Sequence, residues 1–217
     1  DANYWLLRSE DVSGDYPIEE DYWVAAIEYA DSVGVDLVNT SLIYIQNEWP
    51  FPSYKFEDMD GKTALPTRAA NVAASKGILV VCCAGNNGTW VGTPADSPNV
   101  LTVGAVSANG NIGVFTAYGI TVDGRMKPDV VALGLGVNTI DTEGMIVVKS
   151  GTSYASPILC GLAACLWQAF PWLTNRELLD VLKKSSNRGD VPVLPYGYGI
   201  VDIPKAMELI DSMQDKK

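Results

Sequence analysis

A glycine-led turn delivers a serine to the start of an apolar helix late in the chain. Residues 149–157 are Lys-Ser-Gly-Thr-Ser-Tyr-Ala-Ser-Pro, and the apolar stretch 158–170 follows them. Gly151 allows a sharp turn, and we expect Ser153 at or near the helix N-cap, with Pro157 tolerated in the first turn. Unpaired N–H groups and the helix dipole there favour negative charge, which suits a serine nucleophile and an oxyanion. Since Ser and Thr caps are common, this stretch alone indicates only a helix start.

Asn86 fits the same chemistry. It lies in the segment Ala-Gly-Asn-Asn-Gly at 84–88, directly after the apolar run 78–84. Taken alone, such a segment is typical of a turn. Beside a serine nucleophile, however, a carboxamide can donate to the oxygen of a tetrahedral intermediate, a contribution of roughly 3–4 kcal/mol in the transition state. We therefore interpret Ser153 and Asn86 together as candidate catalytic residues.

Four motifs resemble those of the subtilisin-like serine proteases, or subtilases. Gly-Thr-Ser-Tyr-Ala-Ser-Pro at 151–157 is similar to the family's nucleophile motif Gly-Thr-Ser-x-Ala-x-Pro. The segments at 84–88, 127–132 and 196–199 resemble its oxyanion-hole segment, its Lys-Pro-Asp run and its closing Tyr-Gly-x-Gly, in family order. The resemblance covers nearly the whole chain but only the later part of a family catalytic domain. It implies a serine endopeptidase that hydrolyses peptide bonds by acyl transfer through Ser153, with Asn86 in the oxyanion hole.

The chain contains no histidine. A Ser-His-Asp triad needs an imidazole to take the serine proton, so we expect this chain alone to be inactive. The resemblance implies that the aspartate and histidine stretches, with motifs such as Asp-x-Gly and His-Gly-Thr, are encoded before Asp1. Residues 1–217 are therefore expected to form a single partial subtilisin-like peptidase domain.

The resemblance also implies a substrate cleft whose edge pairs with the peptide backbone as an added strand. The edge of the cleft is assigned to Ser41, Leu42 and Ile43. The facing wall is assigned to Ala84 and Gly85, and the floor to Gly92. Ile43 stands where the family has a glycine. Because a β-branched side chain narrows the approach of a peptide, we expect the pocket to differ from the usual shape.

Two alternatives remain open at this point. In the sedolisin branch a glutamate replaces the histidine and an aspartate takes the oxyanion role, which Asn86 speaks against. A non-catalytic pseudoprotease would use the cleft only to bind peptides. The missing histidine fits that second alternative, whereas a decayed enzyme has no need of intact Gly151, Ser153 and Asn86.

Charge and hydropathy narrow the class of partner. The net charge of −11 disfavours nucleic acid and anionic membranes, and no stretch approaches eighteen consecutive apolar residues. The first residues lack the pattern of a signal peptide. We expect a polypeptide substrate, no nucleic acid and no membrane segment, and the resemblance implies a secreted or cell-envelope location.

The cysteines and acidic residues predict neither a cofactor nor a metal. Cys82, Cys83, Cys160 and Cys165 form no CxxC pair and are expected to be buried free thiols, the alternative being a disulfide between Cys160 and the 82/83 pair. Structural calcium occurs in the family, but Asp58-x-Asp60-Gly61 is more typical of a turn. The acidic residues near the N-terminus are interpreted as a solvated loop and a helix start: Glu10, Asp11, Asp15, Glu19 and Glu20.

Hydrophobic periodicity and the resemblance together predict an α/β fold, with a three-layer, mostly parallel sheet flanked by helices and truncated on the N-terminal side. Strands are expected at 3–8, 35–44, 78–84, 100–106, 129–132, 137–141 and 145–149, with 115–119 a short strand or loop. Helices are expected at 18–33, 65–76, 153–170, 174–184 and 203–213, and a long surface loop at 46–64. The helix 153–170 is apolar on most faces and is expected to be buried.

The truncation has a consequence for strand pairing. In subtilisin-like folds the strand that bears the catalytic aspartate lies between those matched here by 3–8 and 36–44. Unpaired strand edges are costly and template further pairing. We therefore expect 3–8 either to pair directly with 36–44 or to exchange with a neighbouring molecule, which would give a strand-exchanged homo-oligomer.

Overall fold

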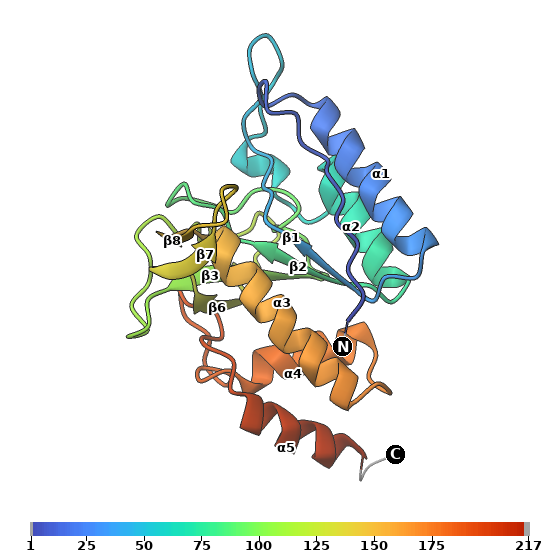
Figure 1. Cartoon of the computed structure of the whole chain (residues 1–217), viewed down its shortest axis with the longest axis vertical. Coiled ribbons are helices and arrows are strands. Elements are labelled where there is room, and N and C mark those ends of the chain that lie inside the picture. Colours follow the sequence, from blue (N-terminus) through green and yellow to red (C-terminus); the bar gives the residue numbers. More distant parts are fainter. Residues whose placement is uncertain (1, 215–217) are drawn as a thin grey trace.

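A parallel four-stranded sheet forms the centre of the computed structural model, which describes residues 2–214. Its strands lie in the order β1-β2-β3-β6 (Figure 1). Their bounds are Leu37–Thr40 (β1), Leu79–Cys83 (β2), Val100–Val106 (β3) and Val130–Leu133 (β6). The register pairs Leu37 with Leu79, Val80 with Val100 and Val103 with Val130. The predicted parallel sheet is confirmed, although only the middle of the expected strand 35–44 forms β1.

Helices cover both faces of this sheet, which gives the predicted three layers. Successive side chains of a strand point to opposite faces. Leu79 and Val81 accordingly belong to the apolar cluster that includes residues of α3, α4 and α5, whereas Val80 and Cys82 belong to the cluster that includes residues of α1 and α2 (Figure 1). The helix bounds are Ile18–Ser32 (α1), Leu65–Ser75 (α2), Thr152–Ala169 (α3), Asn175–Ser185 (α4) and Ile203–Gln214 (α5). The helix expected at 174–184 forms as α4, with Thr174 as its N-cap in a capping box with Glu177.

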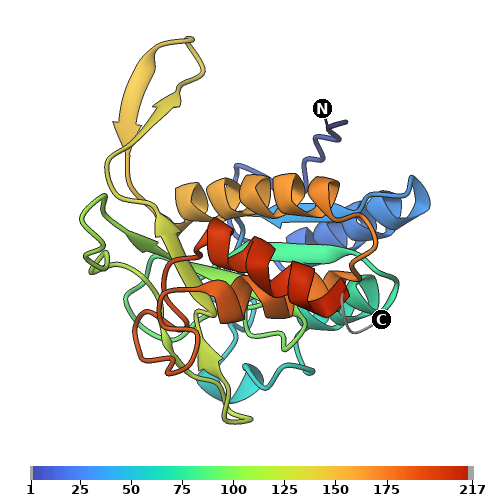
Figure 2. The same cartoon turned by 90° about the horizontal axis from the view of Figure 1, so that it is seen from below.

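Two small antiparallel ribbons and one short helix accompany the central sheet. β4 (Gly119–Ile120) pairs with β5 (Met126–Lys127), and β7 (Val137–Ile140) pairs with β8 (Ile146–Lys149). The expected loop 46–64 contains a 3-10 helix, η1 (Phe56–Asp58). The β7–β8 hairpin projects away from the body of the molecule and leads directly into α3 (Figure 2).

Residues 3–8 do not form the predicted strand, and they do not pair with β1. Tyr4 is 84% exposed and Leu6 93%, while Trp5 packs edge-on against Tyr29 of α1 at a ring-centroid distance of 5.6 Å. A strand needs a neighbouring strand to form hydrogen bonds with its backbone groups. This apolar run lacks one and lies against the surface of α1 instead. Within residues 2–214, β2 is the sole strand partner of β1. Exchange with a neighbouring molecule stays a prediction.

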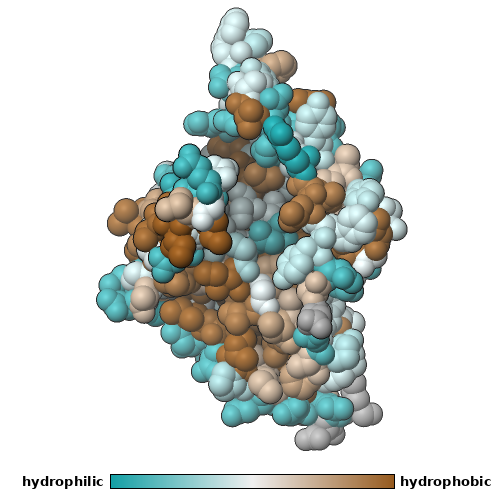
Figure 3. All heavy atoms as spheres, in the orientation of Figure 1, coloured by the Kyte–Doolittle hydropathy of each residue, from teal (hydrophilic) through white to brown (hydrophobic). Residues whose placement is uncertain are grey.

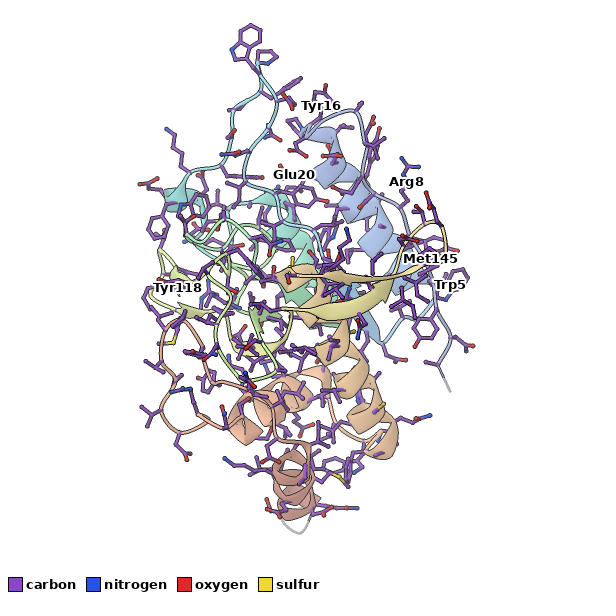
Figure 4. All side chains as sticks on the ribbon, turned by 60° about the vertical axis from the view of Figure 1, so that its left-hand side comes forward. Trp5, Arg8, Tyr16, Glu20, Tyr118 and Met145 are labelled. Carbon is purple, nitrogen blue, oxygen red and sulfur yellow. The ribbon has the colours of Figure 1, made fainter. Side chains whose placement is uncertain are left out.

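The expectation that the helix α3 is buried is wrong for its outer face. Ala155 and Leu159 point into the core, but Ile158 and Leu162 are each 37% exposed. Figure 3 shows apolar surface gathered over α3 and the β7–β8 hairpin. In Figure 2 the hairpin and the N-terminal segment both rise on the side of α3 that faces away from the sheet. In Figure 4, Trp5 of the N-terminal segment and Met145 of the β7–β8 hairpin lie toward the same side of the molecule, and Tyr118 lies toward the other side.

All four cysteines are free thiols, as expected, but they differ in burial. Cys82 and Cys83 are buried on β2, Cys160 is half-buried, and Cys165 is exposed on the outer face of α3. The prediction of burial is therefore wrong for Cys165, because that face of α3 is open.

The acidic residues near the N-terminus are hydrogen-bonded within the molecule and are not simply solvated. Glu19 accepts from the backbone N–H of Asp11 at 2.7 Å, and Glu10 accepts from the hydroxyl of Tyr44 at 2.7 Å. Glu20, which Figure 4 shows on α1, accepts from Tyr54 at 2.6 Å, and burial raises its pKa. Residues 2–214 hold no group of three or more His, Cys, Asp or Glu placed to bind a metal. No helix in the same range combines the length and hydropathy needed to cross a bilayer.

Candidate active site

A close backbone crossing holds the N-terminus of α3 at the carboxyl end of the sheet. Gly134 directly follows β6, and its carbonyl accepts from the N–H of Gly151 at 2.8 Å. A Cβ on Gly134 would lie 2.6 Å from the Cβ of Ala105 and 2.8 Å from the carbonyl oxygen of Gly151. Only glycine fits there, because real Cβ atoms do not approach other atoms so closely. The turn that carries Ser153 is thus fixed to β3 and β6.

Ser153 is the second residue of α3 and not its cap. Gly151 is the N-cap, so Pro157 lies beyond the first turn, contrary to expectation. Proline has no N–H, and the carbonyl of Ser153, four residues earlier, therefore loses its helical donor. The hydroxyl of Ser41 supplies that bond at 3.0 Å, while the Oγ of Ser153 lies 3.5 Å from the carbonyl oxygen of Ser41. Ser41, predicted to bind substrate, thus also ties the chain after β1 to the candidate nucleophile.

Thr152 fixes the side chain of Asn86. The N–H and the hydroxyl of Thr152 each lie 2.9 Å from Oδ1 of Asn86, and its hydroxyl also accepts from the N–H of Gly85 at 3.2 Å. Because a backbone N–H can only donate, the atom that it meets is the amide oxygen. The amide nitrogen Nδ2 faces the turn, 3.5 Å from where a Cβ on Gly151 would lie. Sequence reasoning missed this role of Thr152, although its place in Gly-Thr-Ser was the signal.

Two groups near Ser153 are candidate donors to an oxygen bound there. One is Nδ2 of Asn86, and the other is the N–H of Ser153, at a helix position where N–H groups have no helical acceptor. Asn87 is engaged in its own turn instead. Its Oδ1 accepts from the N–H of Thr89 at 3.0 Å, and its Nδ2 donates to the carbonyl of Trp90 at 3.3 Å. Of these two asparagines, it is Asn86 whose amide nitrogen faces the turn that carries Ser153.

Cys83 lies beside the candidate nucleophile, at the end of β2. Its buried thiol interacts with the hydroxyls of Thr152 and Ser153. The hydrogen bond with Cys82 lowers the pKa of Cys83 against the opposing effect of burial, and burial raises the pKa of Cys82. Sequence reasoning treated Cys83 only as a buried thiol. Its position three residues before Asn86 was the signal that it borders the site.

Five of the six residues assigned to the substrate cleft lie near one another. Leu42 and Ile43 pack against the apolar cluster that contains Ala84, and the carbonyl of Leu42 lies 3.7 Å from the Sγ of Cys82. The side chain of Ile43 lies 3.9 Å from where a Cβ on Gly85 would be, and 2.5 Å from one on Gly92. Thr93, next to Gly92, forms an antiparallel bridge with Tyr44. Ile43 thus occupies the space between Gly85 and Gly92.

A further hydrogen bond joins α3 to β1, and sequence reasoning did not anticipate it. The hydroxyl of Ser156 donates to Oδ1 of Asn39 at 2.7 Å. Together with the link from Ser41 to Ser153, it fixes the first turn and a half of α3 against the end of β1.

The chain is similar in sequence to known serine proteases. A sequence profile of the Subtilase family matches residues 11–200. Subtilisin DY from Bacillus licheniformis is 31% identical over 191 residues, which are 85% of this chain and 61% of that protein. Serine protease AprX from Bacillus subtilis is 32% identical over 160 residues, which are 62% of this chain and 36% of that protein. The chain spans less than two thirds of the length of these relatives.

Solved structures support the fold. The patellamide maturation protease PatA matches with a TM-score of 0.70 at 24% identity, covering 89% of this chain and 69% of that one. The PatG macrocyclase in complex with peptide matches with a TM-score of 0.70 at 22% identity, covering 88% and 57%.

Proposed function

Because the chain belongs to the subtilase family, we propose that it is the part of a serine endopeptidase that carries the nucleophile Ser153 and the oxyanion donor Asn86. One observation carries this proposal. Thr152 holds Oδ1 of Asn86 with both its N–H and its hydroxyl, which turns Nδ2 toward the turn of Ser153. A simple surface turn has no need of such a fixed carboxamide beside a helix N-terminus.

In the proposed reaction, the Oγ of Ser153 attacks the carbonyl carbon of a peptide bond and loses its proton to a general base. The carbonyl oxygen becomes an oxyanion that accepts from Nδ2 of Asn86 and from the N–H of Ser153. Collapse of this intermediate expels the amine, which takes the proton from the base, and leaves an acyl-serine. A water molecule then attacks the acyl-serine, regenerates Ser153 and releases the acid.

The general base must come from outside these 217 residues, because the chain has no histidine. We assign it to a polypeptide segment that contacts the free edge of β1 and the outer face of α3. The exposed side chains of Ile158 and Leu162 support this assignment, since apolar side chains on one open face indicate a contact surface. The isolated chain is then inactive, and residues 1–217 are one partial peptidase domain.

The substrate in this proposal is a polypeptide that binds along Ser41, Leu42 and Ile43, opposite Ala84 and Gly85. The chain after β1 is irregular up to Tyr44, so its backbone can pair with an extended peptide. Secretion or a cell-envelope location remains part of the proposal and follows from the family alone.

Substitution of Asn86 tests the proposal in the complete polypeptide that contains this chain and a histidine-bearing segment. Asn86→Ala should lower turnover about two to three orders of magnitude with little change in the Michaelis constant, because the donor acts mainly in the transition state. Asn87→Ala is the matched control and should leave turnover within about threefold. An Asn86→Ala enzyme with wild-type turnover would move the oxyanion role to another residue. A gene that encodes no histidine-bearing stretch before Asp1 would favour a pseudoprotease instead.

A further inference from the structure

The side chain of Ile43 fills the space beside the reaction centre that two glycines leave open. Neither Gly85 nor Gly92 presents a side chain, and Ile43 lies against both of them. We propose that Ile43 restricts the residue that donates the scissile carbonyl to glycine or alanine. This inference rests on the proposed function, because it concerns the acyl group that Ser153 would carry.

The position of Ile43 follows from the contacts of the two segments that lead away from Ser153. Ser41, two residues before Ile43, donates to the carbonyl of Ser153. On the other segment, Gly85 donates to Thr152 and directly precedes Asn86. For an acyl group on Ser153 with its oxygen at Asn86, we expect the substituent of its Cα next to Gly85, the residue before Asn86. Ile43 is the side chain that lies against Gly85 there, together with Ala117.

Ile43 is also held in place. Its neighbour Tyr44 exchanges two backbone hydrogen bonds with Thr93, at 2.9 and 3.3 Å. The hydroxyl of Thr93 is 2.7 Å from that of Thr67 on α2, and both threonines are fully buried. Ile43 itself is β-branched, and such side chains have few rotamers. The segment therefore cannot move aside for a larger substituent without breaking buried hydrogen bonds.

Gly92 has a different part in this arrangement from the pocket floor that the family resemblance implies. A Cβ at this position would lie 2.5 Å from Cγ2 of Ile43 and 2.5 Å from Cγ1 of Ile45. Glycine is needed there so that these two isoleucines can pack. A hydrogen or a methyl group fits beside Ile43, whereas a leucine or phenylalanine side chain would overpack the same space.

Binding of product peptides tests this inference without turnover, because their carboxylate can accept from Asn86. Acetyl-Ala-Ala-Ala-X-OH peptides, with X as Gly, Ala, Leu or Phe, are titrated into the ¹⁵N-labelled chain, and the amide shifts of Gly85 and Asn86 are followed. The wild-type chain should bind the Gly and Ala peptides at least tenfold more tightly than the Leu and Phe peptides. Ile43→Ala should reverse this order, so that the variant binds the Phe peptide at least tenfold more tightly than the wild-type chain does.

Matched variants separate the effect of Ile43 from a general loosening of the segment. Ile45→Ala removes a similar volume beside Gly92, whereas the nearest side chains to Gly85 are those of Ala117 and Ile43, so this variant should keep the wild-type order. Ile43→Val is the conservative variant if Ile43→Ala does not fold. It should reduce the ratio of affinities for the Ala and Phe peptides by about two- to threefold. Equal binding of the Ala and Phe peptides by the wild-type chain, or an unchanged order in the Ile43 variants, would overturn the inference about Ile43 but not the proposed function. Failure of every peptide to shift Gly85 and Asn86 would overturn the proposed function and this inference with it.

Discussion

The two edges of the central sheet are finished in different ways. At the β6 edge, Val131 donates to the carbonyl of Gly199, and Tyr198 donates to the carbonyl of Asp129. At the β1 edge, within residues 2–214, no segment pairs with β1 on the side away from β2. The apolar run 3–8 lies against α1 instead. The chain therefore completes one edge by itself, and among residues 2–214 it leaves the other edge without a strand neighbour.

A buried ion cluster reinforces the β6 edge. Lys127 is fully buried and donates to Asp129 at 2.6 Å, and Lys183 of α4 donates to the same carboxylate at 2.8 Å. Burial would raise the pKa of Asp129, but the charges of the two lysines outweigh it and lower this pKa. Burial lowers the pKa of Lys127 despite its partner. The carboxylate thus neutralises a lysine that the core could not otherwise hold.

Removal of the Asp129 carboxylate should be the most destabilising single change at the β6 edge. Asp129→Asn leaves Lys127 charged and buried without a counter-charge, so we expect a loss of about 3–5 kcal/mol in the free energy of unfolding. Urea denaturation followed by circular dichroism measures this loss. Asp123→Asn, which breaks the exposed pair with Arg125, should cost less than about 1 kcal/mol. Similar costs for the two variants would mean that the cluster does not stabilise this edge.

The two faces of α3 should respond differently to truncation. Leu159 is 1% exposed in the core, and Leu159→Ala should cost about 2–5 kcal/mol. Leu162 lies on the open face, and Leu162→Ala should change the stability of this chain by less than about 1 kcal/mol. Thermal unfolding of both variants gives the comparison. A cost for Leu162→Ala that matches the core value would show that another chain already covers this face, and self-association would then be measured by light scattering.

The smallest expected effect concerns the link between the open edge and the helix of the nucleophile. A double-mutant cycle over Asn39→Ala and Ser156→Ala should give a coupling energy of about 0.5–1.5 kcal/mol, the usual net worth of a hydrogen bond. Urea denaturation of the two single variants and the double variant supplies the cycle. A coupling energy near zero would indicate that β1 and α3 are held together by packing alone.

Local patterns predicted the parts of the fold that the chain completes by itself. The apolar runs at 79–83 and 100–106 became central strands, and Thr174 became a cap, because neighbours close in the sequence supply their partners. The strand expected at 3–8 failed for the opposite reason. An apolar run indicates that a segment can join a sheet, but its pairing depends on a neighbouring strand, and none lies beside 3–8 within residues 2–214.

In the candidate site, too, local motifs were predictable from the sequence, whereas contacts between distant residues were not. Ser153 and Asn86 were recognisable because their chemistry lies in short motifs. The hold of Thr152 on Asn86, and the placement of Cys83 beside Ser153, depend on contacts between residues 66 to 70 positions apart, which no local pattern encodes. Likewise, the burial of α3 could not be judged from its composition, since its outer face depends on what packs against it.

We propose that this chain holds a nucleophile and an oxyanion site without a general base. Labelling of the isolated, folded chain with a fluorophosphonate tests this proposal, with Ser153→Ala as the control. We predict no labelling above that control, because nothing in the chain takes the serine proton in the manner of an imidazole. Robust labelling that depends on Ser153 would contradict the claim, since it would require a general base among these 217 residues.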